Sequence, residues 1–332
     1  MRALIAVLLL AACAAGEAPA QPETPAAPTT EASAPTPPAP PTTMSLNCAG
    51  AFTQGGVALC RTMPGAAISV DGVASGEADE NGWAVVGFNR EHGPSARVEA
   101  RLMQTSANAQ SSSVSAADYT IAPREFDIQR VNGLPQQTVT PTDPAVLERI
   151  RRESAIKQEG FASIAAIEGF LDGFILPIEG GTVTGRWGNQ RVLNGVPKTP
   201  HYGIDIAAPA GTPIRAPASG VVALAESDLH FEGGLIMLDH GQGLMTYYLH
   251  MIRLDVAVGD NVGQAQVLGA VGRSGRTTGP HLCWRMRWRD RNLDPSLAVH
   301  GLAVARAHFG VAPVIDPGAP PSGFAPWTQA VQ

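Results

Sequence analysis

Lysine is almost absent from this 332-residue chain, which has only Lys157 and Lys198. This scarcity excludes one class of function. Residues 256–272, VAVGDNVGQAQVLGAVG, look like the hairpin of a lipoyl- or biotin-carrying domain, but such a hairpin needs a lysine to hold its cofactor. A surplus of positive charge is also missing, since the formal net charge is −6 and the pI is about 5.7. Nucleic-acid binding usually requires a basic face, so we expect no nucleic-acid partner.

The sequence has no apolar run of the ~20 residues that a membrane-spanning helix needs. Its N-terminus, MRALIAVLLLAACAAG, has one arginine, a shorter apolar run, and then Leu10-Ala11-Ala12-Cys13. This pattern resembles a bacterial lipoprotein signal over residues 1–13, in which cleavage leaves Cys13 as the lipidated N-terminus. An ordinary secretion signal that is cut slightly further along is the alternative. Both predict export, and the first predicts a lipoprotein anchored in the outer membrane and facing the periplasm.

Cysteine is scarce as well, with four residues in the chain. Exported proteins can carry disulfides because their compartment is oxidising. With Cys13 assigned to lipid attachment, Cys48 and Cys60 are close in sequence and are predicted to form a disulfide. Cys283 is then a free thiol. It is either an inert buried side chain or a metal ligand.

Large apolar residues are nearly missing from residues 14–43, which are dominated by alanine, proline and threonine. Such a segment forms no core, and at ~3.1 Å per residue it predicts a tether that reaches up to roughly 90 Å. Beyond it, short runs such as AAISV and WAVVGF alternate with turn sequences such as VDG and ENG. This alternation predicts a small β-sandwich-like accessory domain over residues 45–135.

A helix and a second β-rich region are predicted to follow. Asp143 is a suitable capping residue and Pro144 suits a first helical turn, which indicates a linker helix region over residues 142–173. Residues 174–300 contain strand-like runs separated by glycine-rich turns and predict an antiparallel β-sheet domain. Residues 301–332 are rich in proline and glycine and predict a tail that wraps the surface or frays. The expected fold class is therefore mainly β.

Five side chains of the C-terminal region have the identities and spacing of a single-metal site: His201, Asp205, His250, His281 and Cys283. The first two stand four residues apart, and the glycine between them is expected to let the backbone bend both onto one ion. In HLCWRMRW, alternate residues of a strand share a face, so His281 and Cys283 emerge together. A catalytic zinc needs about three protein ligands and one open position. We predict His201, Asp205 and Cys283 as Zn²⁺ ligands, which leaves His250 and His281 to move protons.

These residues resemble the lysostaphin and LytM family of zinc metallopeptidases, which cut peptide bonds in bacterial peptidoglycan. The resemblance covers roughly residues 174–295 and includes the strand-like segments around the five side chains. It implies a zinc endopeptidase with an open groove, in which His201 and Asp205 are ligands and the pair His250 and His281 assists catalysis. Cys283 departs from the family, because it stands where the family has a third ligand histidine.

The thiol leaves two hypotheses about function. A thiolate in place of an imidazole lowers the charge of a zinc site from +1 to zero and weakens it as a Lewis acid. We therefore expect Cys283→His to raise activity. The alternative is a catalytically weak or inactive LytM-type module that binds the cell wall or activates another wall hydrolase. The expected partners are peptidoglycan stem peptides or cross-bridges and, through the lipid anchor, a membrane. A cell-division or wall-hydrolase protein is a further candidate.

Overall fold

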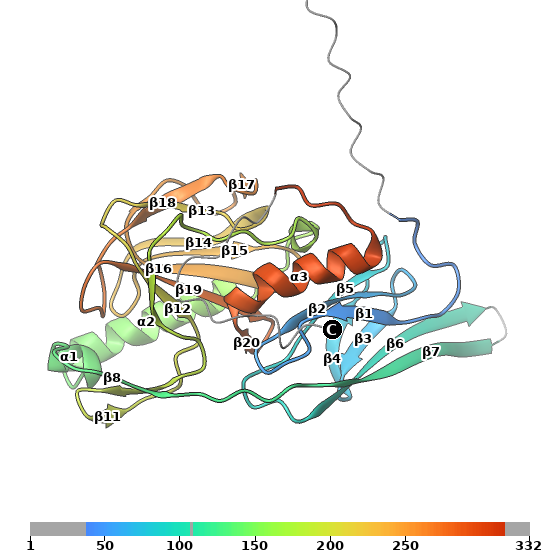
Figure 1. Cartoon of the computed structure of the whole chain (residues 1–332), viewed down its shortest axis with the longest axis horizontal. Coiled ribbons are helices and arrows are strands. Elements are labelled where there is room, and N and C mark those ends of the chain that lie inside the picture. The colour runs from blue at the N-terminus through green and yellow to red at the C-terminus, as the bar shows by residue number, and fades with distance from the viewer. Residues whose placement is uncertain (1–37, 107–108, 316–332) are drawn as a thin grey trace, which may run out of the picture. The chain divides into compact units, whose positions relative to one another are not determined.

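The protein is described by a computed structural model over residues 38–106 and 109–315. Strands dominate it, and most strand pairs are antiparallel, so the predicted mainly β fold class is confirmed (Figure 1). The predicted signal over residues 1–13, with Cys13, lies outside the described residues, as does most of the predicted tether. In the part of the chain that the structure describes, every helix is too short or too polar to traverse a bilayer.

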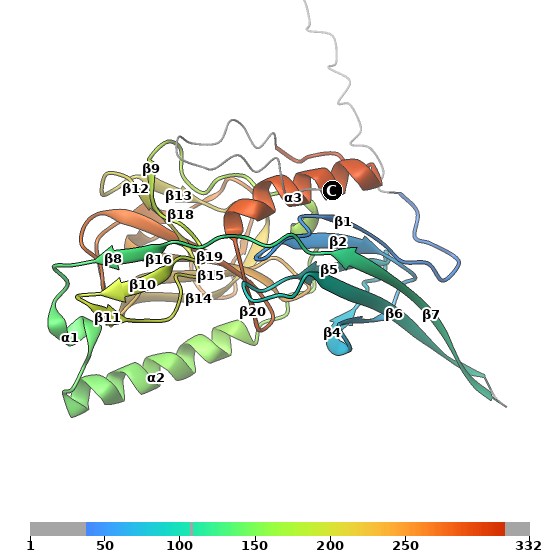
Figure 2. The same ribbon diagram turned by 60° about the horizontal axis from the view of Figure 1, so that its bottom comes forward.

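The N-terminal module consists of two antiparallel sheets, in the strand orders β1-β2-β5 and β4-β3-β6-β7. The strands are β1 (Asn47–Gly50), β2 (Val57–Arg61), β3 (Ala67–Val70), β4 (Val73–Glu77), β5 (Trp83–Gly87), β6 (Ser95–Ser106) and β7 (Ala109–Thr120). A disulfide joins Cys48 and Cys60, which are register partners on β1 and β2. The long β6–β7 hairpin extends away from the rest of the module (Figure 2).

The chain then passes through β8 (Ile128–Val131), the short helix α1 (Gln136–Val139), the long helix α2 (Pro144–Phe161) and the 3-10 turn η1 (Gly169–Leu171). Helix α2 begins as the sequence predicts. The Asp143 side chain accepts hydrogen bonds from the backbone N–H groups of Ala145 and Val146, and Pro144 occupies the first turn. Ile156 and Phe161 then pack this helix against buried side chains of the central sheet.

The C-terminal domain is built on a ten-stranded sheet with the main order β17-β14-β15-β16-β19-β12-β9. Strand β13 pairs with β18, which also pairs with β16, and β20 pairs with β19. The strands are β9 (Thr182–Gly185), β12 (Ile204–Ala207), β13 (Pro213–Arg215), β14 (Gly220–Leu229), β15 (Gly233–Asp239), β16 (Leu244–Leu254), β17 (Asn261–Val262), β18 (Val267–Val271), β19 (His281–Trp288) and β20 (Arg291–Leu293).

A small third sheet links the two parts of the chain. Strand β8 pairs in parallel with β10 (Gln190–Leu193), and β10 pairs with β11 (Val196–Pro197). Figure 2 shows β8 running from the N-terminal module to this sheet. The segment that leaves the N-terminal module therefore becomes part of the C-terminal domain.

The predicted tail over residues 301–332 needs correction, because helix α3 (Pro295–Phe309) extends well into it. The Asp294 side chain accepts a hydrogen bond from the backbone N–H of Ser296, and Pro295 occupies the first turn. Gly310 ends the helix in the left-handed conformation, with φ of 71°. These start and stop signals stand in the sequence, but the proline and glycine content of the residues that follow obscured them.

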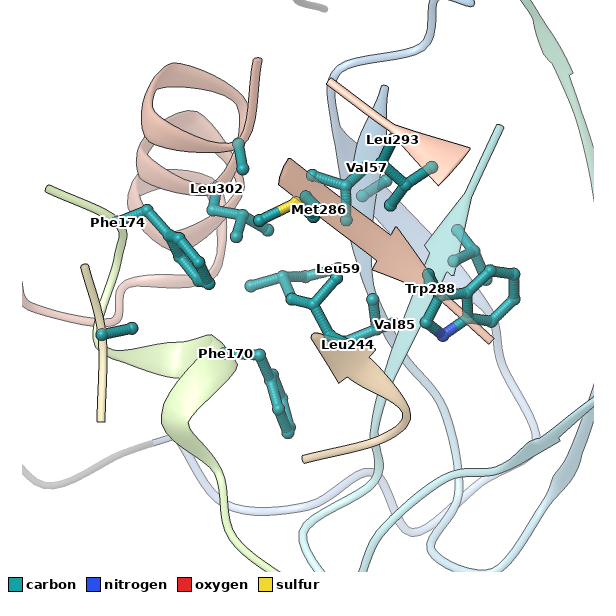
Figure 3. Packing of buried hydrophobic residues seen from close by; sticks show 14 of the residues in the cluster. Val57, Leu59, Val85, Phe170, Phe174, Leu244, Met286, Trp288, Leu293 and Leu302 are labelled. Atoms are coloured by element: carbon teal, nitrogen blue, oxygen red, sulfur yellow. The ribbon is translucent and has the colours of Figure 1, made fainter. Parts of the chain in front are cut away.

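One hydrophobic core joins the N-terminal module to the back of the C-terminal sheet. Figure 3 shows Val57, Leu59 and Val85 of the module beside Met286 and Trp288 of β19. Helix α3 contacts β1, β2 and β19 and adds Leu302 to the same core. The accessory module is therefore packed against the domain that carries the candidate site.

Candidate metal site

The pairing of β12 with β19 brings the predicted ligands together. Asp205 and Cys283 are direct register partners on these neighbouring strands, so their side chains lie on the same face. His201 lies in the loop just before β12. Its Nε2 lies 3.2 Å from Asp205 Oδ1 and 3.3 Å from Cys283 Sγ. The three possible ligand atoms lie within 4.8 Å of one another, which is close enough for one ion to contact all three.

Burial and neighbouring charges shift the pKa values of the candidate ligands. His201 and Asp205 are 2% and 7% exposed. Burial lowers the pKa of His201 to about 4, so its imidazole is neutral at pH 7. Burial opposes ionisation of Asp205, but contacts with His201 and Arg191 outweigh it and hold the pKa of this carboxyl well below its usual range. A neutral imidazole and a carboxylate are the forms that bind metals.

Cys283 is the free cysteine of the described residues and is fully buried. Burial raises the pKa of its thiol to about 12, although the nearby Arg285 guanidinium opposes the rise. Arg285 Nε donates a hydrogen bond to Cys283 Sγ at 3.4 Å. The alternation of β19 places Arg285 on the same face as Cys283, but an alternating pattern does not reveal a contact between the two side chains.

Gly203 has a different role from the one the sequence suggested. It is absent from the positions with left-handed backbone, so a special bend is not the reason for a glycine here. A Cβ at this position would lie 2.7 Å from Arg285 Cγ and 3.1 Å from Cys283 Sγ. The missing side chain therefore makes room for the arginine and the sulfur.

His250 and His281 lie beside the cluster, with ring centres 4.7 Å apart. His250 is on β16 at an irregularity in strand pairing, with a left-handed φ of 66° that few non-glycine residues adopt. Its Nδ1–H donates to the Ser274 carbonyl at 2.8 Å. His281 Nδ1–H donates to the Gly279 carbonyl at 2.9 Å. In both rings Nε2 is left as the proton acceptor.

Burial is also the main influence on the protonation of His250. It lowers the pKa of this imidazole to about 3, and the neighbouring His281 acts in the same direction. His250 is therefore neutral over the whole range in which most enzymes work. A neutral imidazole with a free Nε2 can accept a proton from a reacting group.

A pocket of about 280 Å³ opens at this cluster. Its lining includes Asp205, His250 and His281 together with Gln129 and Leu134 from the chain around β8 and α1. A second arginine, Arg191 of β10, also lines it and forms an ion pair with Asp205 Oδ2. The sequence gives no sign of this contact, because it arises from the place of β10 in the fold and not from a local spacing.

The donor set fits a zinc ion. It combines an imidazole nitrogen, a carboxylate oxygen and a sulfur, all of which zinc accepts. Asp205 Oδ1 is buried, and although His201 Nε2 lies 3.2 Å away, no well-aligned hydrogen bond reaches this oxygen among the described residues; a buried acceptor of this kind needs a partner. An ion at this place would satisfy it. The structure thus brings together all five side chains that the sequence singled out.

Three further histidines of the described residues have partners elsewhere in the fold. His240 is buried and bonds to the Ser219 carbonyl and the Thr246 hydroxyl. His92 lies 3.3 Å from Asp71, and His308 bonds to Asn47. These three rings therefore make contacts away from the candidate metal site.

Comparison with known proteins places this geometry in a family. Residues 199–295 match Peptidase family M23. This part of the chain is an M23 peptidase domain. The match covers His201, Asp205, His250, His281 and Cys283, so the expected relationship to lysostaphin- and LytM-type peptidases is confirmed.

Two curated relatives match the same part of the chain. DD-carboxypeptidase/endopeptidase Mpg of Neisseria meningitidis serogroup B is 41% identical over 95 residues, and peptidoglycan DD-endopeptidase ShyA of Vibrio cholerae serotype O1 is 38% identical over 95 residues. Each match covers 29% of this chain and 22% of the relative. The chain thus spans about a fifth of the length of these relatives.

One solved structure matches a larger part of this chain than the two curated relatives do. The crystal structure of a peptidase M23 from Pseudomonas aeruginosa is 27% identical, with a TM-score of 0.55, and the match covers 76% of this chain and 96% of that one. This coverage exceeds the M23 domain alone. The likeness therefore includes part of the fold outside the M23 domain.

Proposed function

We propose that this protein is a zinc-dependent endopeptidase that hydrolyses peptide bonds in bacterial peptidoglycan. The observation that carries the proposal is the convergence of His201, Asp205 and Cys283 within 4.8 Å, in a domain of the M23 family. The names of Mpg and ShyA describe endopeptidases, and ShyA acts on peptidoglycan. The same class of substrate, stem peptides or cross-bridges, is proposed for this chain.

In this proposal His201, Asp205 and Cys283 hold the zinc ion, which would supply a Lewis acid for the carbonyl of the bond to be cut. His250 and His281 line the pocket, and each uses Nδ1 to bond a backbone carbonyl, so Nε2 is the nitrogen available to exchange a proton. Either ring can take a proton from the attacking water and return one to the leaving amine. The carbonyl groups of Ser274 and Gly279 fix the two rings in this tautomer.

We also propose the location that the N-terminal sequence suggests. Lipid attachment at Cys13 would anchor the chain in the outer membrane, and residues 14–43 would let the folded part reach the wall from the periplasmic side. Incorporation of a labelled fatty acid into the wild-type chain, and its loss in Cys13→Ala, is the direct measurement. A chain that is exported without label would indicate an ordinary secretion signal.

Metal content and turnover together test the enzymatic proposal. We expect about one zinc per chain by elemental analysis, and release of products from defined cross-linked muropeptides. His201→Ala and Asp205→Ala should lose both the metal and the turnover. His308→Ala is the matched control, because this ring is on α3 and bonds to Asn47 instead of the site. Unchanged turnover in the His201 and Asp205 variants would contradict the proposal.

The alternative function predicts a different result from the same experiment. A module that only binds the wall or activates another hydrolase would leave muropeptides intact even when zinc is bound. Co-sedimentation with purified peptidoglycan, or stimulation of a second hydrolase, would then be its positive evidence.

A further inference from the structure

Arg285 is held against the sulfur of Cys283 by several features of the fold. The two residues are on the same face of β19, and Arg285 Nε donates to Cys283 Sγ at 3.4 Å. The guanidinium carbon lies 6.0 Å from the centre of the Tyr247 ring. Gly203 leaves the space that the arginine side chain fills, since a Cβ there would lie 2.7 Å from Arg285 Cγ. This packing fixes the guanidinium beside the sulfur.

Two of the three candidate ligands contact an arginine, and within the described part of the chain the third does not. Asp205 pairs with Arg191, and Cys283 is hydrogen-bonded by Arg285. His201, the neutral ligand, has a buried Nδ1 without a hydrogen-bond partner among the described residues. Each ligand that is anionic when it binds a metal therefore has its own guanidinium. Partners of this kind orient metal ligands and adjust the charge of the site.

We propose that Arg285 is a positioning residue matched to a thiolate at position 283. It directs Cys283 Sγ toward the metal and offsets the negative charge that a sulfur ligand adds compared with an imidazole. This inference rests on the zinc site proposed above. It explains how a cysteine can serve at a position where the resembled family has histidine.

The same geometry changes the expectation for Cys283→His. A metal-bound imidazole presents the N–H of its other nitrogen as a donor, and a guanidinium offers only donors. Histidine at position 283 would therefore meet Arg285 without a hydrogen bond to share. We now expect the single substitution to bind zinc less tightly than wild type. Arg285→Gln in the same chain would supply an amide oxygen as acceptor and recover binding.

A double-mutant cycle on the full chain tests the proposal. Zinc affinity is measured by competition with a chelating dye for wild type, Arg285→Gln, Cys283→His and the double variant. We expect Arg285→Gln to weaken binding roughly 10- to 100-fold when position 283 is cysteine. When position 283 is histidine, the same change should strengthen binding. Arg287→Gln is the matched control, because this neighbouring arginine stacks on Phe161 at 4.1 Å, and its affinity should equal that of wild type.

A spectroscopic signal reports the sulfur ligand directly. Cobalt(II) bound to a thiolate gives a near-ultraviolet charge-transfer absorption, which we expect in wild type and at reduced intensity in Arg285→Gln. Arg285→Lys keeps the charge and should retain more of the band and of the zinc affinity than Arg285→Gln. If Arg285→Gln does not fold, Arg285→Met removes the hydrogen-bond donor while keeping much of the apolar stem, and should weaken zinc binding in the same way.

Each other result has a definite meaning. An equal loss of affinity in the cysteine and histidine backgrounds would show that Arg285 is merely structural, and no loss would show that it has no role. Cobalt binding without the charge-transfer band would remove Cys283 as a ligand and overturn this inference, while a metal site built on His201 and Asp205 would stand. Absence of metal in wild type would refute the proposed function itself.

Discussion

The two faces of β19 carry opposite kinds of side chains. One face buries Leu282, Trp284, Met286 and Trp288 in the core shared with the N-terminal module. The other face presents His281, Cys283 and Arg285 to the candidate site. The alternation of a single strand thus separates residues that hold the fold together from residues that can do chemistry.

This separation has an energetic meaning. Substitutions on the core face should change the free energy of unfolding, and substitutions on the site face should change turnover or metal affinity. Cys283 tests the boundary, because it lies on the site face and is nevertheless fully buried among side chains such as Leu249 and Tyr247. The predictions below sharpen or break the division, beginning with the largest effect.

On the site face, His281→Ala should lower turnover of muropeptides by about 10²–10⁴-fold, since it removes a proton-accepting nitrogen. Bound zinc and the free energy of unfolding should stay close to wild type, because the ring is a candidate proton carrier and only part-buried. Turnover, elemental analysis and urea unfolding measure the three quantities. Loss of the metal in this variant would make His281 a ligand and contradict the assignment of roles.

On the core face, Trp284→Ala should cost about 3–5 kcal/mol of unfolding free energy. Its indole is fully buried in the shared core, and truncation leaves a large cavity. Arg287→Ala, on the other face of the same strand, should cost only about 0.5–1 kcal/mol through its contact with Phe161. Similar losses in both variants, measured by urea unfolding, would break the comparison between the faces.

The disulfide tests whether the core face depends on the N-terminal module. Replacing both Cys48 and Cys60 by alanine should cost about 3 kcal/mol, because the bridge closes a short loop of sequence separation 12. Since the module shares its core with the C-terminal sheet, we expect a single unfolding transition to move as a whole. Two separate transitions in calorimetry would show instead that the module unfolds independently.

The most gradual effect is a dependence of stability on pH. Burial lowers the pKa of His240 from 6.5 to about 4 in the folded chain. Between these values the unfolded chain binds a proton that the folded chain does not, so stability is lost as pH falls from about 6.5 to about 4. The slope for one group is at most about 1.4 kcal/mol per pH unit. It should be shallower in His240→Gln, in urea unfolding of metal-free protein, and an unchanged slope would contradict this assignment.

Patterns that depend on local spacing were predictable from the sequence. The alternation in HLCWRMRW put Cys283 and Trp284 on opposite faces, as found. Asp143 and Pro144 marked the start of α2. The five candidate residues were recognisable as a set from their identities and spacing. The structure brings them together, and the M23 match covers all of them.

Contacts that depend on strand pairing were not predictable. Arg191 lies on β10, which pairs with β8, and from there it reaches Asp205. No pattern in either strand's sequence predicts that the two strands pair. The space at Gly203 reflects close packing against Arg285, which a sequence pattern does not distinguish from backbone freedom. Asp294 and Gly310 mark the two ends of helix α3 in the sequence, but the proline- and glycine-rich composition of the residues beyond it favours an irregular tail.

The pairing of Asp205 with Cys283 has a consequence for how the chain folds. A metal ion bound to both side chains would act as a cross-link between β12 and β19, which are far apart in sequence. Closing so long a loop costs an unfolded chain much entropy, and an ion that binds only the closed form returns its binding energy to the native state. Strand β9 reaches the described sheet only through β12. Chelation would therefore loosen this edge first, and the metal would serve as a fastener of the sheet as well as its chemical centre.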